Sequence, residues 1–434
     1  MSRRLGLLVL ALGLGPWLVG SGAAQRTTAT KLKNGLKVIL RPLEGADQVA
    51  LVLLYSIGSD QDPEGRSGLA HLIEHLYVTS AAGDTPARTA EEFFSAYGNQ
   101  ANAQTGNAYT VIAAVFARDK LEVELKDAAA RMTELEIETS VLAREKGRLI
   151  AEVNNMFGKI PALGARNLAG ERTRPTPLGG RKGGIPDHVN EISLGEIGKR
   201  LEKFYKPANA ILVLAGGIDP EASAKLIRET FGSIPSGEPA PKPSPIGEPR
   251  LGKVDRVEIN PVQPGTSSYV CAAYKAPSSE DELFGPFLIL CKRFMRNVRK
   301  PGLRPFPFSY APLDDPYKVY LIEEVREEES PEDALGRIDE LVSRTLEPEF
   351  AVMELLELKS SFSILLWPET IPDAFLARNP YGLAFALGRH VQMGFSSRGL
   401  EQSLSRIQPE DIRKAGREIF GKSRRAVVVV ESAE

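Results

Sequence analysis

Hydrophobic and polar positions follow the same order of patterns in two parts of the chain. In residues 193–235, apolar positions three and four apart indicate an amphipathic helix, a Pro-containing turn follows, and an apolar run typical of a strand leads into a second helix. Residues 408–434 repeat the helix, turn and strand. Residues 48–76 and 267–294 also match, because each pattern predicts a strand that leads through an acidic loop into a helix. The chain therefore contains two similar halves.

Interleaved strands and helices predict the fold class. We expect an α+β fold of two homologous α/β sandwich domains, each with a mainly antiparallel sheet covered by helices. Two domains also suit the length of 434 residues, which exceeds what one hydrophobic core usually serves. We interpret the Pro- and Gly-rich residues 235–252 as a linker between an N-terminal domain at residues 25–234 and a C-terminal domain at residues 253–434.

Residues 1–24 have the layout of a cleaved secretory signal peptide. Arg3 and Arg4 precede an apolar stretch, and small residues lie around Ala23 and Ala24. We therefore expect a periplasmic or secreted protein with no stable membrane insertion, and an uncleaved membrane anchor is the alternative. The net charge of −2, without a long basic run, argues against binding of nucleic acid.

The chain has two cysteines, Cys271 and Cys291. Both lie in apolar runs, YVCAAY and LILCKR, which favours buried thiols over a disulfide, although an exported protein could pair them. Two cysteines do not make a disulfide framework in either case.

The two halves differ where the first carries GLAHLIEHLY, residues 68–77. The second half has FLILC in place of HLIEH, so the fold does not require these polar residues. On a helix, His71, Glu74 and His75 share one face. Two imidazoles one turn apart can bind zinc, and Glu74 beside them can take a proton from a water on the metal. The alternative is a surface helix with scattered polar residues.

A catalytic zinc ion needs a third protein ligand and an open position for water. His188 and His390 are candidates, but each stands alone, without a second ligand type at helical spacing. A helical pattern in LAREKGRLIAEVNNM places Glu145, Arg148 and Glu152 on one face. Because the two glutamates are two turns apart, one can bind the metal while the other supports the site, and their spacing leaves the choice open.

With an HxxEH motif, typical of inverzincins, followed by a helix with paired glutamates, the sequence resembles the M16 family of metallopeptidases. The likeness covers nearly the whole mature chain, and in length the chain is similar to the short, two-domain type. It implies that Glu152, 77 positions after His75, is the third zinc ligand and that Glu145 supports it. It also implies that Glu74 is the catalytic base.

Two further segments carry the resemblance. FYKPANAILVLAGGIDPE resembles the family's FYxPxNxxLVxxGDxDPE segment, and GNQANAQTGNAYT resembles its GxxxNAxT edge strand. The second likeness implies that Asn102, Ala103 and Gln104 pair with an extended substrate by strand addition. An ordinary exposed sheet edge is the alternative.

One segment departs from the family pattern. M16 enzymes usually carry an Arg and a Tyr seven residues apart in the later domain, which hold and polarise the substrate carbonyl. Here Arg299 fits, but Phe306 stands at the tyrosine position, and Tyr310 follows extra proline-rich sequence. Phenylalanine cannot donate a hydrogen bond to a developing oxyanion. Either an altered loop brings Tyr310 into place, or another subunit supplies the pair.

We therefore expect an exported zinc endopeptidase that cleaves peptides or unfolded polypeptide segments. The resemblance implies a homodimer, or a heterodimer with a second M16-like chain, that encloses a chamber. Two alternatives stay open. The chain could be a non-catalytic or partner-dependent subunit, or it could bind structural zinc, although no fourth His or Cys ligand is evident.

Overall fold

The computed structural model of the chain describes residues 27–158, 183–241, 254–259, 267–277, 281–298, 308–310, 318–347, 351–360, 373, 377–392 and 404–432. The predicted signal peptide, the predicted linker beyond residue 241, Arg299 and Phe306 lie outside the described residues.

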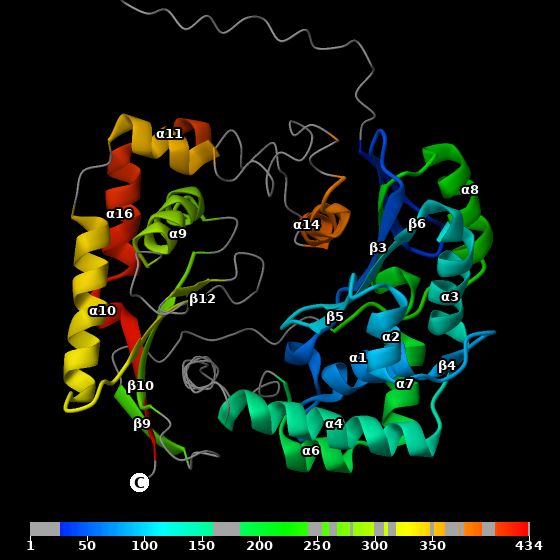
Figure 1. Cartoon of the computed structure of the whole chain (residues 1–434), viewed down its shortest axis with the longest axis horizontal. Helices are drawn as coiled ribbons and strands as arrows, with labels where there is room; N and C mark the ends of the chain where they lie inside the picture. Colours follow the sequence, from blue (N-terminus) through cyan, green and yellow to red (C-terminus); the bar gives the residue numbers. More distant parts are fainter. Residues whose placement is uncertain are drawn as a thin grey trace, which may run out of the picture.

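The first half of the chain forms the sheet that contains β3, β5 and β6 in Figure 1. This sheet has six strands in the order β1-β2-β8-β3-β6-β5. Its strands are β1 (Thr28–Lys31), β2 (Lys37–Pro42), β3 (Gln48–Tyr55), β5 (Ala101–Thr105), β6 (Thr110–Ala117) and β8 (Ala210–Gly216), and β4 (Ala81–Ala82) pairs separately with β7 (Leu135–Glu136). Its helices are α1 (Leu69–Thr79), α2 (Ala90–Ala96), α3 (Leu121–Thr133), α4 (Thr139–Gly158), α6 (Pro186–Glu191), α7 (Leu194–Phe204) and α8 (Pro220–Phe231), with the short 3-10 helices η1 (Ser59–Gln61), η2 (Arg118–Lys120) and η3 (Pro207–Asn209). Among the described strands of this sheet, only β2 and β8 pair in parallel.

The second half forms a five-stranded sheet with the order β11-β12-β10-β13-β9. Its strands are β9 (Val254–Ile259), β10 (Tyr269–Lys275), β11 (Phe308–Tyr310), β12 (Lys318–Glu324) and β13 (Arg425–Ser432). Its helices are α9 (Phe284–Val298), α10 (Pro331–Leu346), α11 (Val352–Ser360), α14 (Pro380–Gln392) and α16 (Pro409–Ile419), with the 3-10 helix η5 (Lys422–Arg424).

The two sheets have the same topology, apart from the additional edge strand β1. Read from β2 to β5, the first sheet corresponds strand by strand to the second, read from β9 to β11, and each has one parallel pair beside antiparallel neighbours. In both, the central strand β3 or β10 leads into the helix α1 or α9. The predicted α+β fold of two similar halves is therefore confirmed.

The central strands of the first sheet are buried on both faces, so β3 reads as a continuous apolar run. Its residues alternate between two cores, because successive side chains of a strand point to opposite faces. Leu51 and Leu53 belong to the core that contains the apolar residues of α1, α3 and α7. Val52 and Leu54 belong to a second core, which contains Leu383 of α14.

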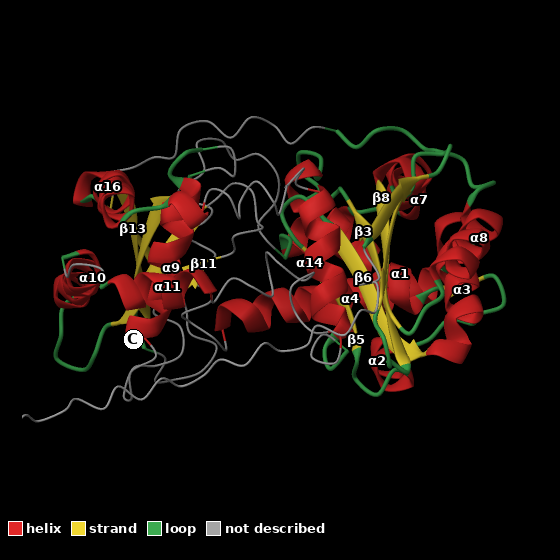
Figure 2. Cartoon of the chain, turned by 90° about the horizontal axis from the view of Figure 1, so that it is seen from above, coloured by secondary structure: helices red, strands yellow, loops and turns green. Residues whose placement is uncertain are grey.

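Helix α14 covers the face of the first sheet opposite α1, although it comes late in the chain (Figure 2). Three polar contacts hold this region in place. Arg41 of β2 forms an ion pair of 2.9 Å with Asp373, Asn102 of β5 donates a hydrogen bond of 2.7 Å to Tyr381, and Gln392 donates to the Ala108 carbonyl. The second core is therefore completed by residues from the second half of the chain.

Cys271 and Cys291 are both buried and are not joined in a disulfide, as the apolar runs around them predicted. Cys271 lies in β10, and burial in α9 raises the pKa of the Cys291 thiol. Within the described residues, every helix is too short or too polar to span a membrane.

Candidate metal centre

The start of α1 is fixed by a carboxylate and a glycine. Asp62 accepts hydrogen bonds of 2.9 Å from the Gly68 and Ala70 amides, which have no partner within the helix. Gly68 has a left-handed backbone with φ +100°, and a Cβ atom there would lie 2.9 Å from the Gly184 Cα atom. These contacts set where α1 begins and therefore which of its residues face α4.

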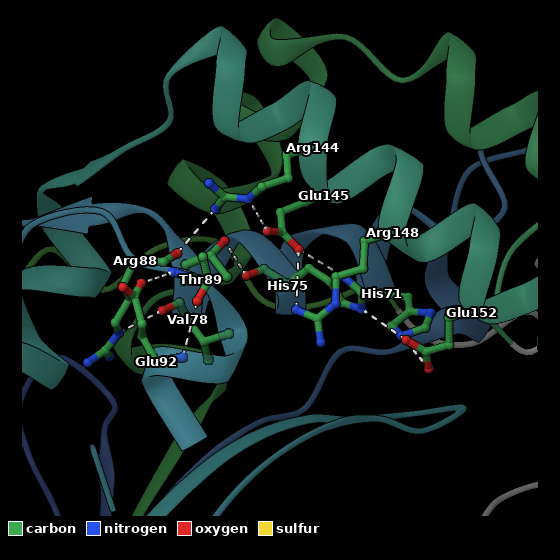
Figure 3. Close-up of polar contacts among 11 residues, drawn as sticks. His71, His75, Val78, Arg88, Thr89, Glu92, Arg144, Glu145, Arg148 and Glu152 are labelled. Carbon is green, nitrogen blue, oxygen red and sulfur yellow. Dashed lines mark hydrogen bonds and ion pairs between the residues drawn. The ribbon is translucent and has the colours of Figure 1, made fainter. Parts of the chain in front are cut away.

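His71 and His75 of α1 meet Glu152 of α4 (Figure 3). The His71 Nε2 atom lies 3.8 Å from one carboxylate oxygen of Glu152, and the His75 Nε2 atom lies 3.5 Å from the other. Ligands about 2.0–2.1 Å from a tetrahedral zinc ion lie about 3.4 Å from one another. The three side chains therefore have the donor types that zinc binds, and one ligand atom from each lies within 4.8 Å of the others.

The other nitrogen of each imidazole has its own oxygen partner. The Nδ1 atom of His71 lies 2.9 Å from the Gly183 carbonyl oxygen, and the Nδ1 atom of His75 lies 3.3 Å from the Glu145 carboxylate. Such partners fix the tautomer and the ring orientation of metal-binding histidines. Both rings therefore direct Nε2 toward Glu152.

Glu145 is 1% exposed and lies on the side of His75 away from Glu152. Arg144 donates a hydrogen bond of 2.9 Å to Glu145 and another to the Arg88 carbonyl (Figure 3). Burial disfavours the charged carboxylate, but the contact with His75 and the hydrogen bond from Arg144 outweigh it and lower the pKa of Glu145. Glu145 therefore supports the cluster as an anion.

Without a metal ion, the cluster attracts protons. Burial disfavours the charged imidazolium of His75, yet the facing carboxylates of Glu145 and Glu152 outweigh it and raise the pKa of His75 to about 9. The hydrogen bond with His75 correspondingly lowers the pKa of Glu152. A site that holds a proton this tightly has an excess of negative charge, which a divalent cation would also neutralise.

Glu74 is buried beside this cluster, with 6% of the residue exposed. The Thr105 hydroxyl, at the end of β5, donates a hydrogen bond of 2.6 Å to its carboxylate. Both residues line an open cavity of about 310 Å³. The cavity is lined by His71, Glu74, His75, Val78, Ala90, Phe94, Ala103, Gln104, Thr105, Arg148, Glu152 and Gly183.

The predicted substrate-binding residues fall into two groups. Asn102, Ala103 and Gln104 lie on β5, the edge strand of the first sheet, and the last two line the cavity. Tyr310 ends β11, which occupies the corresponding edge of the second sheet. The structure describes only the backbone of Tyr310, and Arg299 lies outside the described residues. The pairing of Arg299 with Tyr310 stays a prediction.

Neither of the other two histidines belongs to the metal cluster. The Nδ1 atom of His188 accepts a hydrogen bond of 3.3 Å from the Ser67 amide. His390 is buried in α14, where burial and the neighbouring Arg389 lower its pKa to about 4. Both residues therefore serve other parts of the structure.

Thr105 and Gly183 were not predicted as site residues. Thr105 is the threonine of the NAxT segment, so the likeness that pointed to Asn102 contained a signal for it. Gly183 contributes a backbone carbonyl to His71 from a distant segment, and no local sequence pattern predicts such a contact.

Comparison with family models identifies two matching regions. Residues 37–180 match the model described as insulinase (peptidase family M16), and residues 191–310 match the model described as the peptidase M16 inactive domain.

Two curated relatives illustrate the level of similarity. The zinc protease PqqE of Helicobacter pylori is 26% identical over 260 residues, which cover 58% of this chain and 57% of the relative. The mitochondrial-processing peptidase subunit beta of Neurospora crassa is 22% identical over 267 residues, 61% of this chain and 56% of the relative. The chain thus spans little more than half the length of these curated relatives.

Solved structures share the fold across the chain. A protease from Helicobacter pylori superposes with a TM-score of 0.78 at 17% identity, covering 94% of this chain and 99% of that one. The first half of the periplasmic protease PqqL from Escherichia coli gives a TM-score of 0.68 at 16% identity and covers 94% and 92%. At these identities the likeness establishes the fold alone.

Proposed function

Because the chain belongs to the M16 family of peptidases, we propose that it is an exported zinc-dependent endopeptidase that hydrolyses peptides or unfolded polypeptide segments. The observation that carries this proposal is the convergence of His71, His75 and Glu152 beside Glu74 in one open cavity. The layout of residues 1–24 and the periplasmic location of the structural relative PqqL support a periplasmic or secreted protein.

His71, His75 and Glu152 would hold the zinc ion, with Glu145 and the Gly183 carbonyl fixing the two imidazoles. Bound zinc supplies Lewis acidity, which lowers the pKa of water to about 7 and polarises a carbonyl. Three protein ligands leave a coordination position for water, as a catalytic site requires.

Glu74 would act as general base in this reaction. Its carboxylate accepts the hydrogen bond from Thr105 with one oxygen, which leaves the other oxygen for the proton of the attacking water. Burial excludes competing solvent from the carboxylate. Glu74 would later return the proton to the leaving amine.

The edge strand β5 would hold the peptide. It pairs with β6 on one side, and among the described residues no strand pairs with its other side. Ala103 and Gln104 line the cavity, so a peptide added along this edge would pass the metal centre. An extended chain is required for such pairing, which favours short or unfolded substrates over folded proteins.

A second candidate function, a partner-dependent subunit, is favoured by one observation. Phe306 stands where family members carry the tyrosine that polarises the substrate carbonyl. A homodimer would then depend on Arg299 and Tyr310, whereas a heterodimer would take the pair from a second M16-like chain. The relative from Neurospora crassa is itself named as a subunit.

The test compares Glu74→Gln with wild type. Zinc content is measured by mass spectrometry and cleavage by an internally quenched peptide library, with each protein alone and with a second M16-like chain. We expect the variant to keep its zinc and to lose cleavage by at least a hundredfold. Glu91→Gln, which changes an exposed glutamate outside the cavity, is the matched control and should cleave normally.

Three outcomes separate the candidates. Equal cleavage by Glu74→Gln and wild type would contradict the proposed function. If wild type cleaves peptides only when the second chain is present, the chain is a partner-dependent subunit. Zinc binding without cleavage under either condition would leave the chain a non-catalytic subunit.

A further inference from the structure

Arg148 is a cation at the metal centre that the reaction described above does not use. It lies on α4 between Glu145 and Glu152, one helical turn before the latter, and lines the same cavity. The step of four residues from Arg148 to Glu152 corresponds to about 6 Å along the helix axis. Figure 3 shows its side chain directed from α4 toward the histidines of α1. Arg148 therefore lies within reach of a substrate residue that flanks the scissile bond.

Arg148 is not needed to neutralise Glu145. That carboxylate already accepts a hydrogen bond from Arg144 and faces His75. Arg148 is 3.8 Å from it, which is too long for a hydrogen bond, and its side chain is 46% exposed. Among the described residues Arg148 makes no hydrogen bond, and beside this ion pair it interacts only electrostatically with Glu152, so its guanidinium donors are available to a ligand.

The cavity around Arg148 has an apolar wall. Val78 of α1 and Ala90 and Phe94 of α2 line it together with the guanidinium. A ligand group that suits both surfaces has an aliphatic stem and an anionic end. A guanidinium binds a carboxylate through two parallel hydrogen bonds, a geometry that amides and hydroxyls do not match.

We propose that Arg148 is a specificity-determining residue that binds a carboxylate of the peptide substrate beside the scissile bond. This inference rests on the proposed peptidase function. The carboxylate can come from a glutamate or aspartate side chain, or from a free C-terminus one or two residues beyond the cleaved bond. A cationic side chain at the same position is repelled.

The experiment uses the full mature chain and two sets of quenched peptides. In the first set the C-terminus is amidated, and the peptides differ only by Glu, Gln or Lys at each position flanking the scissile bond. In the second set a Gln peptide has either a free or an amidated C-terminus near that bond. Wild type is compared with Arg148→Gln, Arg148→Lys and Arg148→Glu.

If the carboxylate is a side chain, we expect wild type to cleave one Glu peptide with kcat/KM about tenfold above that of its Gln counterpart. If it is a C-terminus, the free-carboxylate peptide should exceed its amidated counterpart by the same factor. This is the lower end for a hydrogen bond to a charged group, because the Arg148 side chain is half exposed. Arg148→Gln should bring the ratio close to one, Arg148→Lys should retain part of it, and Arg148→Glu should favour the Lys peptide. The set that shows the preference identifies the source of the carboxylate.

A binding measurement separates specificity from support of the metal. In the Glu74→Gln background, fluorescence anisotropy gives dissociation constants for the uncleaved peptides, and the ratios should follow the same order. Arg144→Gln is the matched control on the same helix, because it weakens the support of Glu145 without altering the cavity wall. It should lower zinc content or cleavage of all peptides alike.

Wild-type ratios near one in both peptide sets would overturn the inference and leave the proposed function intact. An Arg148→Gln variant that loses zinc, or that lowers kcat/KM for every peptide by the same factor, would also overturn the inference and leave the proposed function intact. Failure of zinc-loaded wild type to cleave any peptide, alone or with the second chain, would overturn the proposed function and this inference with it.

Discussion

Helices α1 and α9 occupy the same place in the two halves of the molecule, yet they bury different side chains. Each follows the central strand of its sheet and packs beneath it. Where α1 has Glu74 and His75, α9 has Leu290 and Cys291, both at most 1% exposed. The fold therefore forms with apolar residues at these positions.

The polar residues of α1 must be compensated by other segments. Burial of a charged or polar side chain without a partner costs several kcal/mol, on the order of 2–7 for a neutral group. Thr105 satisfies Glu74, and Glu145 with its bonded Arg144 faces His75. A set of residues from β5 and α4 thus supports a polar pair that folding does not need, which argues for a chemical role.

The most severe way to test this comparison is to give α1 the character of α9. In the triple variant Glu74→Leu, His75→Leu and Glu145→Gln, we expect zinc binding to be lost and peptide cleavage to fall by more than about a thousandfold. The melting temperature in EDTA should stay within a few degrees of wild type, because similar volumes replace the buried polar groups. Zinc analysis, cleavage assays and calorimetry measure the three quantities. Unfolding of the variant would show that these residues are needed for the fold.

A second change separates the two glutamates of α4. Glu152 faces the Nε2 atoms of both histidines, whereas Glu145 faces only the Nδ1 atom of His75. We expect Glu152→Gln to weaken zinc binding more than Glu145→Gln, for which the loss should be about 10–100-fold. Competition with a chromophoric chelator measures both. The reverse order would exchange the roles of the two residues.

The raised pKa of His75 predicts that the affinity for zinc depends on pH. Helix α9 has no histidine beside a glutamate at the corresponding positions, so the second half of the molecule cannot show this dependence. In the metal-free protein His75 is protonated below its pKa of about 9, and zinc requires the neutral imidazole. Each zinc ion bound at pH 7 should therefore displace this proton, and the zinc dissociation constant should fall about tenfold per pH unit as the pH rises toward 9.

Calorimetry in buffers of different ionisation enthalpy counts the released protons. Glu145→Gln removes a carboxylate that raises the pKa of His75, so the dependence should move to lower pH in that variant. A zinc affinity that is constant between pH 7 and pH 9 would contradict the prediction.

The smallest expected effect concerns Thr105 of β5, whose hydroxyl donates a hydrogen bond to Glu74, the proposed general base. Thr105→Val keeps the shape of the side chain and removes the hydrogen bond to Glu74. We expect kcat to fall about tenfold, the lower range for a bond to a charged group, while KM and zinc content stay unchanged. Thr105→Ser should restore kcat. A change in KM alone would assign Thr105 to substrate binding instead.

Local patterns predicted much of this molecule. Side-chain periodicity is set by the backbone geometry of each element, so the sequence alone predicted two similar halves, the fold class and the common face of His71, Glu74 and His75. The same periodicity placed Glu145, Arg148 and Glu152 on one face of α4. It could not say which glutamate faces the histidines, and only the resemblance to a family pointed to Glu152.

The tertiary structure decided how these faces meet. The position of α4 against α1 places Glu152 beside both Nε2 atoms, Glu145 behind His75 and Arg148 in the cavity wall. The contacts of Thr105 with Glu74 and of α14 with the first sheet join segments far apart in the chain. Such contacts depend on the packing of whole elements around a core, and no short-range pattern of residues specifies that packing.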